Sequence, residues 1–384
     1  MRLKHGIDLG YCTNIHRGET WPETFAALRE YTLRVKGRVC AAGEKYGIGL
    51  RLGADAAREL ASGEALVEFK NWLDENGCYV FTINGFPYGK FHGTRVKEQV
   101  YRPDWTEANR AEYTKLLFDL LVELVGEGGE GSVSSLPGSF KEFITDDEAQ
   151  GREIIEQLGD VCEYIERLRV ETGKDLHLGL EPEPLGWFET SRETVEFFER
   201  FRERWGGRFD EVLGVNYDTC HLAVEYEEAG DALGRLVDCG VRISKLHLSS
   251  ALELEPTAEA LERLKEFGDG VYLHQVVVRD GEKPLRRFRD LGDALESGCG
   301  GDEWRVHFHV PVHAQPDLVF GDTRDHLSGV LKVLGENPGL CRHLEIETYT
   351  WEVLPEELRT ADVVDQLAKE YEWTLGQLRA NGLA

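Results

Sequence analysis

Short apolar runs alternate with longer amphipathic stretches along nearly the whole chain. This alternation predicts parallel strands joined by crossover helices, because parallel neighbours need a long connection between them. Eight such strands in one closed sheet, each followed by a helix, form a (β/α)8 barrel. The runs that we expect to be strands cover residues 6–15, 46–52, 79–84, 132–136, 176–181, 212–217, 243–248 and 344–347.

The amphipathic stretches between these runs have lengths that suit helices. Thr106 and Thr190 are typical helix starts, because a threonine hydroxyl accepts a hydrogen bond from a free N–H of the first turn. Gly128 and Gly173 are typical stops, because glycine adopts the left-handed conformation that ends many helices. We expect helices over residues 21–39, 106–127, 147–171 and 192–205.

One stretch breaks the regular alternation. The segment from about residue 250 to residue 320 separates the seventh and eighth predicted strands, and it carries two further apolar runs, 271–278 and 304–310. We interpret it as a long insertion over the C-terminal mouth of the barrel, within a single domain that spans residues 1–384. Long loops on that face of a barrel commonly carry function.

Polar side chains follow the fifth and sixth predicted strands. Proline cannot donate to a sheet ladder, so Pro182 ends the fifth strand and leaves Glu181 at its C-terminal rim, with Glu183 two residues further on. The sixth strand ends at Asp218, and His221 follows three residues later. That spacing lets the carboxylate and the imidazole converge on one point.

The seventh and eighth predicted strands extend the pattern. His247 ends the seventh strand, and Glu345 and Glu347 alternate with apolar residues on the eighth. The insertion adds His307 and His309 in a His-Phe-His sequence. Carboxylate and imidazole ligands together suit a divalent metal ion, with Zn²⁺ or Mn²⁺ favoured and Mg²⁺, Co²⁺ or Fe²⁺ compatible.

Composition narrows the partners. Aspartate and glutamate total 71 against 44 lysine and arginine, a formal net charge of −27, which repels nucleic acid and anionic membranes. No apolar run approaches the roughly 20 residues of a membrane span, and the first residues do not resemble a signal peptide. The eight cysteines include no Cys-x-x-Cys pair, so we expect free thiols in a cytoplasmic protein.

The strand-end residues resemble the metal pattern of the xylose-isomerase-like TIM-barrel superfamily. That pattern has Glu on strand five, Asp-x-x-His on strand six, His on strand seven and Glu on strand eight. The resemblance implies a metal held by Glu181, Asp218, His247 and Glu347, with Glu181 and Glu347 as catalytic proton carriers. His221 falls on the histidine of the Asp-x-x-His motif, which faces the substrate in the epimerases, and it is a further candidate metal ligand. In endonuclease IV, another member, an Asp-x-His sequence after strand seven binds more metals; His307 and His309 lie in a similar place here but lack the aspartate.

Several longer motifs are similar to EboE-type proteins, which are associated with the traffic of prenyl- or terpenoid-type precursors. The motifs are Tyr11-Cys-Thr-Asn-Ile-His16, Thr82-Ile-Asn-Gly-Phe-Pro-Tyr-Gly89, Asp218-Thr-Cys-His221, His307-Phe-His-Val-Pro311 and Glu347-Thr-Tyr-Thr-Trp351. From these motifs and the strand ends we take as candidate substrate-binding residues Tyr11, Asn14, His16, Asn84, Glu183, His274, Glu345 and Trp351.

Three functions compete on this pattern. The favoured one is a metal-dependent isomerase or epimerase that acts on a small polyol, sugar or related metabolite through a metal-stabilised enediolate. The second is an EboE-type protein that binds or carries a precursor without turnover. The least favoured is an endonuclease IV-like phosphodiesterase, because a duplex binder needs a basic face. The sequence leaves the oligomeric state open.

Overall fold

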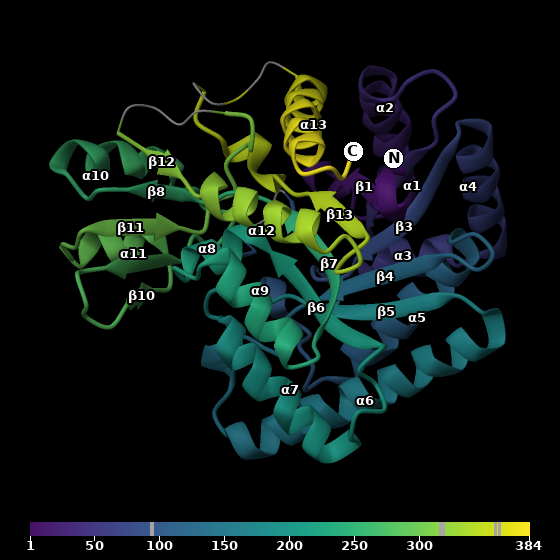
Figure 1. Ribbon diagram of the computed structural model, residues 1–384, viewed down its shortest axis with the longest axis horizontal. Coiled ribbons are helices and arrows are strands. Elements are labelled where there is room, and N and C mark those ends of the chain that lie inside the picture. The colour runs from purple at the N-terminus through teal and green to yellow at the C-terminus, as the bar shows by residue number, and fades with distance from the viewer. Residues whose placement is uncertain (93–95, 315–318, 357–358, 360–361) are drawn as a thin grey trace.

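The computed structural model describes residues 1–92, 96–314, 319–356, 359 and 362–384. Eight parallel strands form its central sheet, in the order β1-β13-β7-β6-β5-β4-β3-β2, and a bridge between Cys12 and Gly49 joins the two ends. The chain is therefore the predicted (β/α)8 TIM barrel (Figure 1). Its strands are β1 Asp8–Tyr11, β2 Tyr46–Arg51, β3 Cys78–Asn84, β4 Glu130–Ser135, β5 Asp175–Leu180, β6 Leu213–Asp218, β7 Arg242–Leu248 and β13 His343–Ile346.

Helices surround this sheet. Thr190 caps α7 with a complete capping box, and Gly173 ends α6 at a φ of 67°, so both predicted boundaries are confirmed. The boundaries predicted at Thr106 and Gly128 differ from the structure by a few residues, because α5 begins at Ala108 and ends at Leu124. The helices of the barrel are α1 Trp21–Ala27, α2 Leu33–Val39, α3 Ala54–Leu60, α4 Gly63–Glu75, α5 Ala108–Leu124, α6 Asp147–Thr172, α7 Ser191–Trp205, α8 Thr219–Val224, α9 Ala229–Asp238, α12 Arg324–Glu336 and α13 Val363–Ala380.

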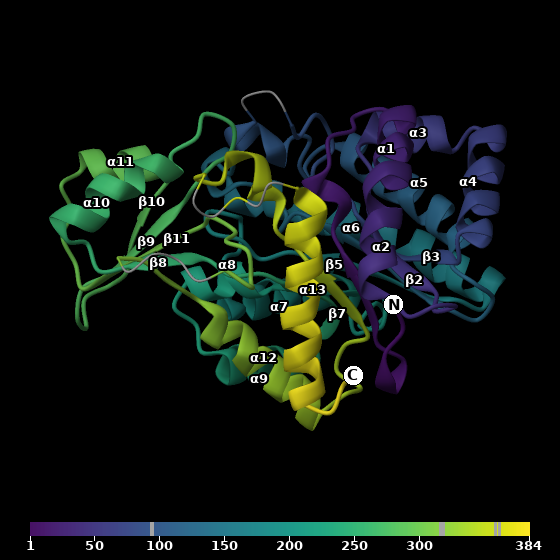
Figure 2. The same ribbon diagram turned by 90° about the horizontal axis from the view of Figure 1, so that it is seen from above.

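The insertion between β7 and β13 builds a second, five-stranded antiparallel sheet, in the order β10-β9-β11-β8-β12. It has its own apolar core around Trp304 and Val276, and it projects from one side of the barrel (Figure 2). Its elements are β8 Leu252–Leu254, α10 Ala258–Leu264, β9 Val276–Arg279, β10 Arg286–Phe288, α11 Leu291–Glu296, β11 Glu303–Val306 and β12 Gly321–Asp322.

The two apolar runs of the insertion are strands over only part of their length. The strands that they contribute to are β9, Val276–Arg279, and β11, Glu303–Val306. The backbone before β9 turns away because the carbonyl of Val271 accepts hydrogen bonds from Val96 and Lys97 in the loop after β3. His307 and His309 consequently lie beyond the end of β11, where the chain enters the barrel mouth.

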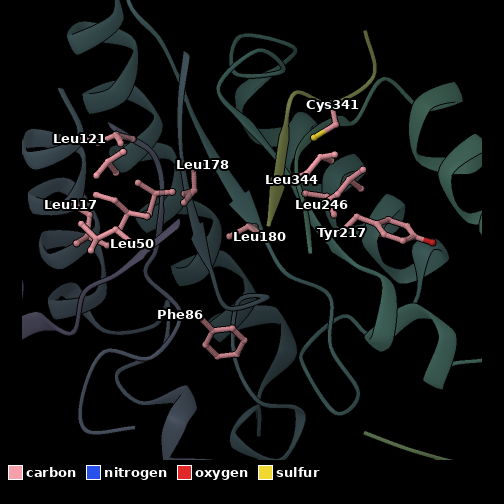
Figure 3. Close-up of a cluster of buried hydrophobic side chains, with 14 of the residues drawn as sticks. Leu50, Phe86, Leu117, Leu121, Leu178, Leu180, Tyr217, Leu246, Cys341 and Leu344 are labelled. Carbon is pink, nitrogen blue, oxygen red and sulfur yellow. The ribbon is translucent and has the colours of Figure 1, made fainter. Parts of the chain in front are cut away.

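The barrel is held by a continuous apolar core. Leucines of the strands, such as Leu50, Leu178 and Leu344, are fully buried, and Leu117 and Leu121 of α5 pack among the same cluster (Figure 3). Truncating a buried leucine of this kind to alanine costs about 2–5 kcal/mol. This packing fixes the strand ends, and so it fixes the positions of the polar side chains that follow them.

Candidate metal centre

Four side chains from successive strands converge at the C-terminal mouth of the barrel. Glu181 directly follows β5, Asp218 ends β6, His247 lies in β7 and Glu347 directly follows β13. The Nδ1 atom of His247 lies 3.1 Å from Glu181 Oε1, 3.3 Å from Asp218 Oδ2 and 3.1 Å from Glu347 Oε2. One ligand atom from each residue falls within 4.8 Å of the other three, and all four residues are buried. The strand-end pattern in the sequence therefore corresponds to one point in space.

Two of the carboxylates have one oxygen fixed and the other directed at the centre. Asp218 Oδ1 accepts hydrogen bonds from the Cys220 N–H at 2.7 Å and from the Ser249 hydroxyl at 2.6 Å. Glu347 Oε1 accepts one from Asn14 Nδ2 at 2.8 Å. Such outer contacts orient metal ligands, and here they leave Asp218 Oδ2 and Glu347 Oε2 facing His247 Nδ1.

The Nε2 atom of His247 contacts another carboxylate, that of Glu345. His247 Nε2 lies 3.0 Å from Glu345 Oε2, and the same oxygen accepts from Lys245 Nζ at 2.7 Å. Burial alone would raise the pKa of Glu345, but Lys245 and His247 together outweigh it and lower that pKa to about 2. An ionised Glu345 accepts the Nε2–H, so the Nδ1 lone pair is available to a metal.

Glu345 reaches this position because Gly49 on β2 leaves space for it. A Cβ at residue 49 would lie 1.9 Å from Glu345 Oε1. Glu345 is fully buried and is absent from the four-residue group, whereas Glu347 belongs to it. The structure thus places Glu347 at the centre and Glu345 behind His247.

The buried carboxylates of the centre would be stabilised by a bound cation. Among the described residues, Glu181 Oε2 and Asp218 Oδ2 are buried without a hydrogen-bond partner. Burial alone would lower the pKa of His247, but the carboxylates of Glu347 and Glu181 outweigh it and raise the pKa well above its usual value. Buried carboxylates are stable only when paired or bound to metal. Three carboxylates and one imidazole therefore fit a divalent ion.

Three further histidines lie beside this centre and share one arrangement. The Nδ1–H groups face carbonyl oxygens: His221 faces Pro182 O at 3.0 Å, His307 faces Gln275 Oε1 at 2.7 Å and His309 faces Glu347 O at 2.9 Å. Their Nε2 atoms are left for other ligands. Ligand atoms of Asp218, His221 and His309 lie within 4.8 Å of one another, as do those of Glu183, His221 and His307. The seven predicted metal ligands thus fall into a four-residue group and an adjacent histidine group.

A cavity of about 70 Å³ opens beside the two groups. Of the predicted substrate-binding residues, Asn14, Asn84 and Glu183 line it, together with Glu181, His221, His307 and Glu347. Phe86, Pro87 and Tyr349, which belong to two of the sequence motifs, also line it. The rest of the lining was not expected from the sequence, because it belongs to segments without hydrophobic periodicity: Phe91, Val96, Lys97, Val100, Tyr101, Tyr272, Leu273 and Gln275.

The remaining predicted substrate-binding residues do not line the cavity. The Tyr11 hydroxyl bonds His16 and Thr32 at 2.7 Å each, within the barrel wall. His274 lies between Asp269 and the carbonyl of His307, so it supports the histidine group from behind. Trp351 packs against the apolar cores of the barrel and of the insertion.

Comparison with known proteins agrees with this architecture. The chain matches the model of the xylose isomerase-like TIM barrel family over residues 44–293. The protein therefore belongs to the xylose isomerase-like TIM barrel family. The match is to the family as a whole, and it does not confirm the EboE type. A search of curated proteins finds no significant match.

Solved structures share the fold at low sequence identity. A xylose isomerase-like TIM barrel protein from Mycobacterium smegmatis in complex with magnesium is 13% identical, with a TM-score of 0.55 over 98% of this chain and 97% of that one. The IOLI protein with a bound zinc atom is 12% identical, with a TM-score of 0.53 over 98% and 99%. A D-tagatose 3-epimerase-like protein is 12% identical, with a TM-score of 0.52 over 98% of each chain.

No helix in the described part of the chain combines the length and the apolar character of a membrane span.

Proposed function

We propose that this protein is a divalent-metal-dependent enzyme of the isomerase or epimerase type, which acts on a small hydroxy-carbonyl metabolite. The observation that carries the proposal is the convergence of Glu181, Asp218, His247 and Glu347 on one buried point. No lysine or arginine forms an ion pair with their carboxylates among the described residues. Zn²⁺ or Mn²⁺ is the proposed ion, and structural relatives hold zinc or magnesium.

The bound ion would hold the substrate's adjacent oxygens and stabilise the negative charge that develops when a neighbouring C–H is deprotonated. Glu181 and Glu347 come from different strands and both line the cavity. In the proposed reaction one glutamate takes the proton from the carbon next to the carbonyl, and the other returns a proton to the adjacent atom or to the opposite face. His221 and Glu183 also line the cavity and would contact the substrate.

The His221, His307 and His309 group is the proposed place for any additional ion. Its three Nδ1–H groups face carbonyl oxygens, an arrangement typical of histidine ligands. Phosphodiester cleavage is disfavoured, because Lys97 is the only lysine or arginine among the described residues of the cavity lining, and it is paired with Asp290.

The test is deuterium exchange in D2O. Protein loaded with Mn²⁺ or Zn²⁺ is incubated with a panel of ketoses, inososes and simple hydroxy-ketones, and the C–H next to each carbonyl is followed by NMR. We expect exchange or conversion of at least one compound, lost in Glu181→Gln and in Glu347→Gln and retained in His5→Asn, which removes an exposed histidine far from the mouth. A metal-loaded protein that retains a compound without exchange would favour the carrier function instead.

A further inference from the structure

The lining of the cavity beside the metal centre consists of two sets of side chains. One set, the metal end, comprises the carboxylates, imidazoles and amides that surround the centre. The other set, the apolar wall, comes from the loop after β3, from the insertion and from the segment after β13. The residues of this apolar wall are Phe86, Pro87, Phe91, Val96, Val100, Tyr101, Tyr272, Leu273 and Tyr349. A substrate that fills the cavity therefore meets polar groups on one side and hydrocarbon on the other.

The polar side chains nearest the apolar wall are already engaged within the protein. Gln275 donates from Nε2 to Pro184 O at 2.9 Å and accepts at Oε1 from His307. The Tyr272 hydroxyl lies 2.9 Å from His92 Nδ1, and Lys97 pairs with Asp290. These groups are fixed by neighbours and are poorly placed to satisfy a substrate's hydroxyl groups.

The polar atoms without a hydrogen-bond partner belong mostly to residues of the metal end. Among the described lining residues they are Asn14 Oδ1, Glu181 Oε2, Glu183 Oε2 and His307 Nε2, together with the hydroxyl of Tyr101 in the apolar wall, which is directed at Glu183. Burying a hydroxyl group without a hydrogen bond is unfavourable, because the group loses its bonds to water. A fully hydroxylated sugar would incur this cost for each hydroxyl group that faces the apolar wall.

Within the described residues, the lining offers no free positive charge. Glu181, Glu183 and Glu347 contribute carboxylates, and Lys97 is occupied by Asp290. A phosphate group normally needs arginine, lysine or a helix N-terminus directed at it. The charge of the cavity thus opposes a phosphorylated substrate.

From the two-ended cavity we infer that the substrate is a small, unphosphorylated hydroxy-carbonyl compound with an aromatic or branched aliphatic body. The inference rests on the proposed function, because the metal centre receives the oxygenated end. The apolar wall then receives the body. Each CH2 group or ring carbon that leaves water for this wall favours binding.

Three probes with the same hydroxy-ketone end separate the possibilities. They are 2-hydroxyacetophenone, dihydroxyacetone and dihydroxyacetone phosphate, titrated by calorimetry into metal-loaded protein whose metal content is measured in parallel. We expect 2-hydroxyacetophenone to bind at least tenfold more tightly than dihydroxyacetone, and the phosphate to bind no more tightly than dihydroxyacetone.

A matched pair of variants locates the preference. Val100→Thr replaces a methyl group of the apolar wall with a hydroxyl of similar size, and Val195→Thr makes the same change on α7, outside the cavity. We expect Val100→Thr to reduce the preference for the phenyl compound about threefold or more and Val195→Thr to leave it unchanged. Thermal unfolding of both variants controls for loss of structure.

The outcomes are distinguishable from failure of the proposed function. Equal binding of the probes, tighter binding of dihydroxyacetone or its phosphate, or no binding by metal-loaded protein would overturn the inference about the substrate. Deuterium exchange on the sugar panel would then still support the isomerase proposal. Absence of metal uptake would instead contradict the metal centre itself.

Discussion

Two clusters of carboxylates and histidines lie at opposite ends of the barrel, and they differ in what balances their charge. At the N-terminal end, Arg242 Nη2 lies 2.7 Å from Asp175 Oδ2 and 3.1 Å from Glu130 Oε1, and His177 bonds the same glutamate. At the C-terminal end, Glu181, Asp218 and Glu347 surround His247 without a paired lysine or arginine among the described residues.

The difference shows why residue type alone does not identify a metal site. Both clusters hold acids and imidazoles, but only one is completed by the chain's own cations. In TIM barrels the C-terminal face carries the active site and the N-terminal face serves stability. We therefore expect changes at the lower cluster to alter the free energy of unfolding, and changes at the upper cluster to alter metal binding.

The largest expected effect on stability belongs to the lower cluster. Arg242→Ala leaves Glu130 and Asp175 without their shared partner, so we expect the free energy of unfolding to fall by about 2–3 kcal/mol, discounted for the partial exposure of Asp175. Denaturant unfolding measures the change, and metal content of the folded variant should equal that of the wild type. If Arg242→Ala lost its metal at unchanged stability, the lower cluster would serve metal binding instead of stability.

The same cluster predicts a dependence of stability on pH. Burial alone would raise the pKa of Glu130, but the hydrogen bond from His177 and the nearby charges outweigh it and lower the pKa below its usual value. A lowered carboxyl pKa contributes stability above the unfolded value of about 4.3, and this contribution is lost as the pH falls below it. Unfolding curves between pH 7 and pH 3 should therefore show a smaller loss in Glu130→Gln than in the wild type.

Glu345→Gln tests the support behind the metal centre. The variant keeps an oxygen that can accept the His247 Nε2–H but loses the charge paired with Lys245. We expect metal affinity to fall about tenfold, measured by competition with a chelating dye. The double variant Lys245→Met, Glu345→Gln removes both buried charges and leaves neither unpaired. It therefore separates the effect of Glu345 on the orientation of His247 from the effect of an unpaired lysine on stability. Unchanged affinity in both proteins would show that Glu345 does not position His247.

The smallest expected effect has the opposite sign. In the presence of a chelator, Glu181→Gln removes one negative charge from the upper cluster, and we expect the metal-free protein to become more stable by about 1 kcal/mol. With saturating metal the order should reverse, because the wild type gains the binding energy of the ion. Thermal unfolding with and without metal gives both comparisons. Destabilisation of the metal-free variant would indicate that the upper cluster is balanced internally.

Much of the fold could be predicted from the sequence, because parallel strands in a barrel are short apolar runs separated by amphipathic helices. The first strand is the main exception. The predicted run covers residues 6–15, whereas β1 ends at Tyr11 and Thr13–Ile15 form a 3₁₀ turn. The strands of the insertion are also shorter than its apolar runs, and the first run leaves the sheet where the Val271 carbonyl bonds Val96 and Lys97, about 175 residues earlier in the chain. Such pairing leaves no local pattern.

The site could be predicted in part for a similar reason. Glu181, Asp218 and His247 stand at strand ends, and the ends of parallel strands meet at one edge. The alternation of Glu345 and Glu347 places both on one face, and only the packing against Gly49 and Lys245 separates them. Lys245 lies two residues before His247 on the same strand, so the two side chains share one face. This spacing is the signal in the sequence that could have identified Lys245 as the partner of Glu345.

The most direct test of the metal centre is the metal content of protein purified without a chelator or a metal-affinity tag, beside the double variant Glu181→Ala, His247→Ala. Inductively coupled plasma mass spectrometry should find at least one Zn²⁺ or Mn²⁺ per wild-type chain, lost in the folded double variant and retained in His5→Asn. A wild-type protein that carries no metal and takes up none on addition would contradict the account.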